Sequence, residues 1–173
     1  LPETTQRYGR RLAEALTEQK QESGTQPPSF AVFSATGLPS DLAGQGIDQN
    51  SDPVYSTTVL VSSRLGGYRQ VEESVGAGFG TGRLEPASGD GPVIVGAHTY
   101  PPLPGAMMWW RNSVTDVASL CLQPPAGLIV AGDFNATRDH APLRNLGGCA
   151  SAGEQAGIGG LATWPSSTGT TLL

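Results

Sequence analysis

An acid and an amide follow a short apolar run in the second half of the chain. Asp133 and Asn135 come just after residues 128–131, which read Leu-Ile-Val-Ala, and a single glycine, Gly132, separates the run from the acid. An apolar run bounded by glycine is typical of a buried strand. Polar side chains just past the end of such a strand are where ligands bind in layered α/β folds. Residues two apart in an extended chain point to the same side, so we predict that Asp133 and Asn135 face one ligand, with Phe134 turned into the core.

A histidine stands at the end of a second apolar run. Residues 92–97 read Pro-Val-Ile-Val-Gly-Ala, His98 follows them, and Pro101 and Pro102 end the strand soon after. Both patterns also have a purely structural explanation. Asp and Asn favour turns, and a single histidine is more often a core or surface residue. On spacing alone, catalysis and simple turn formation both stay open.

The elements that would position these residues follow from periodicity. Tyr8, Leu12 and Leu16 recur at helical spacing after Thr4 or Thr5, which predicts a capped helix that buries this stripe. Short apolar segments predict strands over residues 30–34, 57–63, 68–75 and 77–84. A second helix is expected over 107–122, with its core-facing stripe formed by Trp110, Val114, Val117 and Cys121. A short third helix, over 140–146, is expected to be capped by Asp139.

Composition limits the class of protein. A length of 173 residues predicts a single domain over 1–173 that is large enough to bury a core. The net charge is −5 and no basic cluster is present, which argues weakly against a nucleic-acid groove. No apolar run approaches the about 20 residues that a membrane span needs. The two cysteines, Cys121 and Cys149, are compatible with one disulfide in an exported protein or with two buried thiols.

The five residues Gly132-Asp-Phe-Asn-Ala136 resemble the signature of the endonuclease/exonuclease/phosphatase (DNase I-like) superfamily. Further matches in the family's order are Leu1-Pro2-Glu3, the Ser-Arg pair at 63–64, the strand that ends in His98, and the Thr-Trp pair at 163–164. The resemblance implies an α/β fold, the four-layer α/β/β/α sandwich. It also implies metal-dependent hydrolysis of phosphodiesters or phosphomonoesters.

The resemblance further implies roles for individual residues. Glu3 would bind Mg²⁺ or Mn²⁺, although an exposed glutamate favoured by the helix dipole is the alternative. His98, Asp133 and Asn135 would be catalytic: His98 contacts the phosphate or the leaving group, Asp133 activates water and Asn135 positions the phosphate. Arg64 and Trp164 would join Asn135 in binding substrate. A solvated Arg64 and a core Trp164 stay open.

Two motifs of the family are not found in the sequence: an Asn-bearing strand before Glu3 and an Asp-His pair after Trp164. We therefore expect the central part of the fold, incomplete at both ends. Such a fragment would be weakly active or inactive and could self-associate through exposed sheet edges. The alternative function is a catalytically inactive extracellular binding module. The substrate stays open between nucleic acid, a phospholipid headgroup and a small diester. Scarce lysine and the similarity to secreted or membrane-anchored bacterial members predict an extracellular location.

Overall fold

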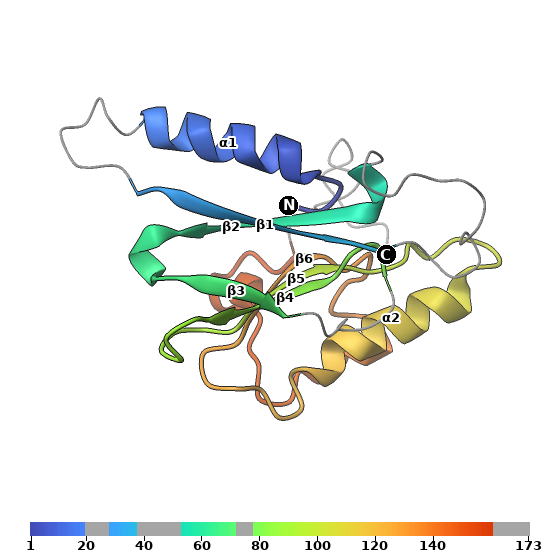
Figure 1. The fold of residues 1–173 in the computed structure, drawn as a ribbon. Helices are drawn as coiled ribbons and strands as arrows, with labels where there is room; N and C mark the ends of the chain where they lie inside the picture. Colours follow the sequence, from blue (N-terminus) through green and yellow to red (C-terminus); the bar gives the residue numbers. More distant parts are fainter. Residues whose placement is uncertain (20–27, 38–52, 72–77, 161–173) are drawn as a thin grey trace.

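The computed structural model describes residues 1–19, 28–37, 53–71 and 78–160. Within these residues the chain forms two sheets, and a long helix lies on the outside of each (Figure 1). The longer elements are α1 (Gln6–Gln19), β1 (Phe30–Thr36), β2 (Ser56–Ser62), β3 (Tyr68–Val71), β4 (Gly82–Pro86), β5 (Ile94–His98), α2 (Met107–Ser119) and β6 (Ile129–Asp133). The shorter ones are η2 (Pro53–Tyr55), η3 (Ser63–Leu65), α3 (Ala141–Arg144) and α4 (Ala152–Gln155). The order α1, first sheet, second sheet, α2 confirms the predicted α/β sandwich.

The first sheet pairs β1 with β2 in antiparallel register, from Phe30 opposite Ser62 to Thr36 opposite Ser56. The first residues of the chain lie along the other edge of β2. Pro2 bridges Thr57, and the backbone N–H of Thr58 donates to the carbonyl of Leu1 at 2.9 Å. This pairing holds the segment that carries Glu3 at the start of β2.

The second sheet has the order β3-β4-β5-β6, and its last pair is parallel. The register runs from Ile94 opposite Ile129 to His98 opposite Asp133. The connection between these strands contains α2, as a parallel crossover requires. Since the two strands run in the same direction, their carboxyl ends meet at one edge of the sheet.

Residues 128–131 were predicted to form a buried strand. The strand is present as β6, but it is not buried. Ile129 is 48% exposed, and Ala131 and Asp133 are exposed as well. The physical reason is that β6 is the last strand in the order that the described residues form. Within the described parts of the chain, β5 is the strand that pairs with it. Apolar composition indicated a strand here, but it did not determine how many neighbours that strand has.

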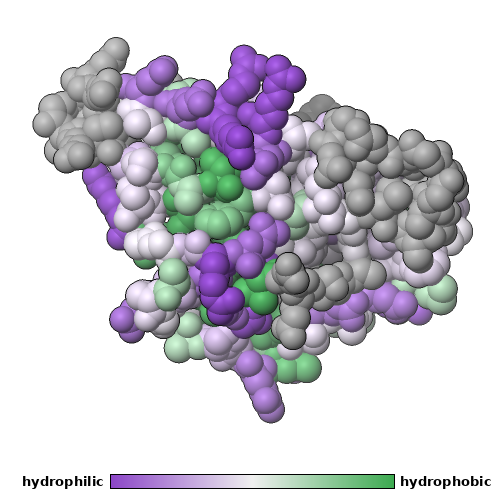
Figure 2. Space-filling view, in the orientation of Figure 1, coloured by the Kyte–Doolittle hydropathy of each residue, from purple (hydrophilic) through white to green (hydrophobic). Residues whose placement is uncertain are grey.

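The buried face of α1 also differs from the predicted one. Tyr8 is 60% exposed and Leu16 36%, whereas Gly9 and Ala13 are buried. A Cβ at Gly9 would lie 2.5 Å from Cγ2 of Thr58 on β2, so the helix uses its smallest residues to approach the sheet. Figure 2 shows the hydrophilic outer surface of α1 and the hydrophobic residues over β1 and β2 beneath it. The predicted cap is confirmed, because the Thr5 hydroxyl accepts from the N–H of Tyr8.

The second helix follows the prediction closely. Trp110, Val114, Val117 and Cys121 are all buried, with Trp110 and Val114 in the core cluster beside Tyr100. Cys121 forms a disulfide with Cys149, which settles the alternative that the sequence left open. This bridge ties the end of α2 to the segment after α3.

The short helix after the β6 loop is α3, and its predicted cap is wrong. The N-cap residue is His140 rather than Asp139, and α3 ends at Arg144. Pro142 lies in the first turn of α3, where its fixed φ suits a helix start. No helix in the described residues is both long enough and apolar enough to cross a membrane.

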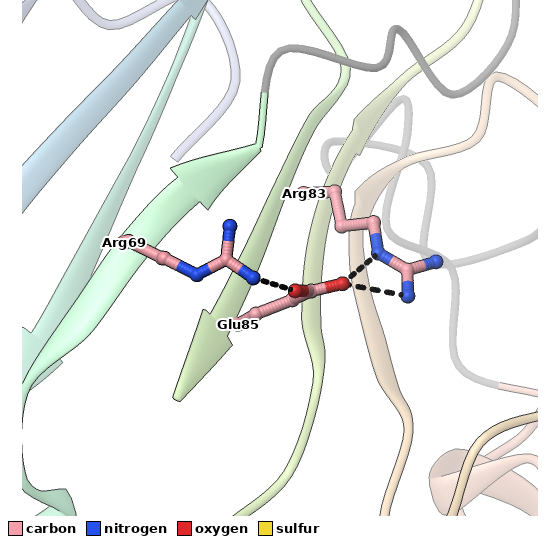
Figure 3. Close-up of polar contacts among 3 residues, drawn as sticks. All are labelled: Arg69, Arg83 and Glu85. Carbon is pink, nitrogen blue, oxygen red and sulfur yellow. Dashed lines mark hydrogen bonds and ion pairs between the residues drawn. The ribbon is translucent and has the colours of Figure 1, made fainter. Parts of the chain in front are cut away.

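A charged cluster joins β3 to β4 at the end of the sheet away from His98. Glu85 accepts from Arg69 across the strands at 2.6 Å and from two nitrogens of Arg83 on its own strand, at 3.0 and 3.2 Å (Figure 3). Arg69 and Glu85 are register partners, so this is a cross-strand pair. One carboxylate thus binds two guanidinium groups within the sheet.

Candidate active site

The site is built on the paired carboxyl ends of β5 and β6. His98 is 2% exposed, and Asp133 stands opposite it in the parallel register with its side chain exposed. The two residues are far apart in the sequence, and the crossover through α2 brings them together. The structure thus places the predicted histidine and acid side by side.

Gly132 explains why a glycine precedes the acid. Its φ is 153°, and a Cβ there would lie 1.9 Å from the carbonyl oxygen of Ala97. No side chain fits at that distance, so only glycine allows the end of β6 to approach β5 this closely. The close approach fixes where Asp133 leaves the sheet.

Glu3 reaches the same edge from the first sheet. Next to its segment, Thr57 donates from its hydroxyl to the carbonyl of Phe79 at 3.4 Å, and the N–H of Phe79 donates to the carbonyl of His98 at 2.9 Å. Glu3 is exposed and has a φ of 52°, an uncommon conformation for a residue other than glycine. These contacts connect the two sheets at the end of the molecule where His98 lies.

The protonation of His98 reflects this setting. Burial lowers the pKa of His98 from its ordinary 6.5, and the negative charges of Asp133 and then Glu3 partly oppose that shift. Both carboxylates are therefore close enough to interact with the imidazole. Since burial is the largest cause, the ring is neutral at pH 7 and retains one donor and one acceptor nitrogen.

The ring of Phe79 packs against His98. The centroid of the Phe79 ring lies 5.3 Å from that of His98 and 4.8 Å from that of Tyr100. His98 is 2% exposed, and this burial is why its charged form is disfavoured. Within the described residues, Nδ1 of His98 is buried without a hydrogen-bond partner. A buried nitrogen in that state would be stabilised by a ligand atom.

Asn135 takes a different position from the predicted one. The strand ends at Asp133, and Asn135 has a φ of 43°, so the rule for extended chain no longer applies. The side-chain amide of Asn135 donates to the carbonyl of Thr99 at 2.9 Å, just past β5. Its backbone N–H donates to Oδ1 of Asp133 at 2.8 Å. Asn135 thus lies across the ends of both strands, while Phe134 packs against the core cluster as predicted.

Of the other predicted site residues, Arg64 does not join this arrangement. Arg64 is exposed in η3 at the far end of β2 from Glu3, to the left in Figure 1. Trp164 lies outside the described residues. His140 is half-buried: its Nδ1 accepts from the N–H of Thr137 at 2.9 Å, and its ring packs edge-on against Trp110.

The donor set fits Mg²⁺ better than a metal held by a closed cage. In the described ranges, no three His, Cys, Asp or Glu side chains are placed so that they could hold one ion. Glu3 and Asp133 offer hard carboxylate oxygens that are exposed to water. Mg²⁺ is commonly bound through one or two carboxylates together with waters and substrate phosphates.

Two residues that hold this site together were missed at the level of sequence. Thr99 is fully buried directly after His98, and Trp110 was assigned to the core alone. A threonine next to the strand-terminal histidine is a weak signal. The hydrogen bond of Trp110 could not be predicted, because the spacing of apolar residues shows that a side chain is buried but not where its N–H donates.

The chain was compared with models of known protein families, with curated proteins and with solved structures. A family model described as the endonuclease/exonuclease/phosphatase family matches residues 2–172. Neither a curated protein nor a solved structure matches the chain significantly. The matched range includes Glu3 and the strand ends that carry His98 and Asp133. The chain therefore belongs to the endonuclease/exonuclease/phosphatase family, which has a DNase I-like α/β fold and hydrolyses phosphoesters.

Proposed function

We propose that the chain acts as a metal-dependent phosphodiesterase-type hydrolase. The observation that carries this proposal is the convergence of Glu3, His98 and Asp133 at one end of the two sheets. The first and last of these are separated by most of the described chain. Their charges nevertheless converge on one imidazole, because both carboxylates act on the pKa of His98.

The roles follow from the chemistry of each side chain. Neutral His98 would donate a hydrogen bond to a non-bridging oxygen or to the leaving group. Asp133 is exposed, and one of its oxygens is fixed by the N–H of Asn135, so it would orient and deprotonate the attacking water. Asn135 uses one amide hydrogen on Thr99, and the second one would position the phosphate. Glu3 would hold Mg²⁺ or Mn²⁺, which supplies Lewis-acid stabilisation of phosphoryl charge.

Alanine substitution of Asp133 tests the proposal. We expect hydrolysis of bis(p-nitrophenyl) phosphate to fall at least about 100-fold, since general acid–base groups contribute about 10²–10⁴. Asp90, exposed in the turn before β5, is a matched control, and its alanine variant should keep wild-type activity. If Asp133→Ala retains more than about a hundredth of the rate, Asp133 is not a principal catalyst. Both variants should be assayed beside the wild-type protein with the same divalent metal.

The catalytically inactive binding module is the competing function. It would be favoured if the protein fails to hydrolyse any phosphoester with any divalent metal. The substrate class is open between nucleic acid, a phospholipid headgroup and a small diester, and the charge of −5 gives no reason to prefer nucleic acid.

We also propose that the protein acts outside the cell, either secreted or anchored to the outer side of a bacterial membrane. The Cys121–Cys149 disulfide supports an oxidising location. Self-association is proposed through β6, whose Ile129 is 48% exposed at the sheet edge. Sedimentation velocity over a range of concentrations would detect such a dimer. Replacement of Ile129 by lysine should abolish it.

A further inference from the structure

The loop Asp133-Phe134-Asn135 is held by more hydrogen bonds than a turn of its length needs. All three of its backbone carbonyls accept a hydrogen bond from one of two residues. The carbonyl of Asp133 accepts from the N–H of Thr99 at 3.0 Å, and that of Phe134 accepts from the Thr99 hydroxyl. The carbonyl of Asn135 accepts from the indole N–H of Trp110 at 2.9 Å.

We propose that Trp110 and Thr99 are positioning residues that hold the amide of Asn135 in its working orientation. The inference rests on the proposed role of Asn135 in binding phosphate. Neither residue touches the reacting atoms in this proposal. Trp110 acts through the backbone of the loop, and Thr99 acts through that backbone and also accepts directly from the side-chain amide of Asn135.

Backbone conformation is the first reason. Asn135 has a φ of 43°, an uncommon conformation that asparagine adopts more readily than most residues other than glycine. Such a conformation persists only where its surroundings over-determine it. The indole of Trp110 fixes the carbonyl of that same residue, and Trp110 itself is 6% exposed in the core. The ring is therefore a rigid support for the conformation.

The orientation of the amide is the second reason. Thr99 offers a backbone carbonyl, which can only accept, so the group of Asn135 that points to it must be the NH₂. This assignment fixes which way Oδ1 and the second N–H point. Thr99 is fully buried and follows His98 directly, so one residue links the histidine to the amide.

The ring of Trp110 has a second neighbour that the test must leave intact. It packs edge-on against the imidazole of His140, with the centroids 5.0 Å apart. Replacement by phenylalanine keeps an aromatic ring in the core and removes the indole N–H. Trp109 provides the matched control, since it is adjacent in sequence and only partly buried, and its ring stacks on Tyr100 instead.

The experiment compares Trp110→Phe with Trp109→Phe by two independent measurements. In nuclear magnetic resonance spectra, the side-chain amide of Asn135 should exchange with water faster in Trp110→Phe and unchanged in Trp109→Phe. In the hydrolysis assay, kcat should fall about 10-fold in Trp110→Phe with KM nearly constant, because a misplaced positioning group weakens the transition state. Thr99→Val should give the same two changes as Trp110→Phe. Thr99→Ser should keep the wild-type amide exchange and kcat, since serine keeps the hydroxyl.

The two measurements separate this proposal from the proposed function. Faster exchange of the Asn135 amide in Trp110→Phe, in a protein without any hydrolytic activity, would support the positioning role and contradict the proposed enzymatic function. An amide and a kcat that change equally in both tryptophan variants would overturn the positioning role, because general loss of packing would then explain the effect. No change in either measurement for Trp110→Phe would overturn it as well.

Discussion

Replacement of Gly132 by alanine should strongly destabilise the protein, because this glycine lies where β6 comes closest to β5. An added Cβ would lie 1.9 Å from the carbonyl oxygen of Ala97, and the φ of 153° is one that L-residues rarely adopt. The conformational cost is about 1–2 kcal/mol. Forcing the strands apart adds about 1–3 kcal/mol, as is usual for overpacking. The free energy of unfolding should therefore fall by about 2–5 kcal/mol.

Gly157→Ala separates these two contributions. Gly157 also has a positive φ, of 72°, but no atom lies within 4 Å of the position that an added Cβ would take, so only the conformational cost of about 1–2 kcal/mol applies. Urea denaturation of the three proteins, followed by circular dichroism with the slope m compared, gives both values. A Gly132→Ala protein that is no less stable than Gly157→Ala would refute the steric explanation. Unchanged hydrolysis by Gly132→Ala would show that the position of Asp133 does not depend on the close approach.

Three further predictions concern stability. Replacing Cys121 and Cys149 by alanine should lower the free energy of unfolding by about 3–4 kcal/mol, since the disulfide closes a loop with a sequence separation of 28. Urea denaturation of the oxidised wild type and of the double variant measures this loss, and a loss below about 1 kcal/mol would contradict it. Because the pKa of His98 is lowered in the folded protein, the unfolded chain takes up a proton first as pH falls through about 6.5. Wild-type stability should thus decline from about pH 6.5 toward 5 more steeply than that of His98→Asn, and parallel curves would refute the shift. Glu85→Gln should cost about 0.5–1 kcal/mol because two arginines lose their partner, whereas Glu14→Gln on the exposed side of α1 should leave the urea midpoint unchanged.

Much of the fold was predictable because local patterns determine it. The stripe of Trp110, Val114, Val117 and Cys121 has helical spacing and is buried as predicted. The strands that end in His98 and Asp133 were also recognisable, because apolar runs bounded by turn-forming residues have few other solutions.

The parts that could not be predicted depend on contacts between distant segments. The predicted buried face of α1 is shifted by one residue from the observed one, since Gly9 and Ala13 approach the sheet more closely than leucine would allow. The direction of the Asn135 side chain depends on a φ of 43° that no local pattern encodes. The hydrogen bond from Trp110 to this residue could not be predicted either, because an indole in an apolar stripe is interpreted as a core side chain.

Hydrolysis of bis(p-nitrophenyl) phosphate, with Mg²⁺ and with EDTA, is the decisive assay for a metal-dependent hydrolase. The protein should be assayed at one concentration with each divalent metal in turn. We expect metal-dependent turnover that EDTA abolishes. Turnover that persists in EDTA would contradict the role of Glu3 as a metal ligand, and absence of turnover with every divalent metal would contradict the hydrolase itself.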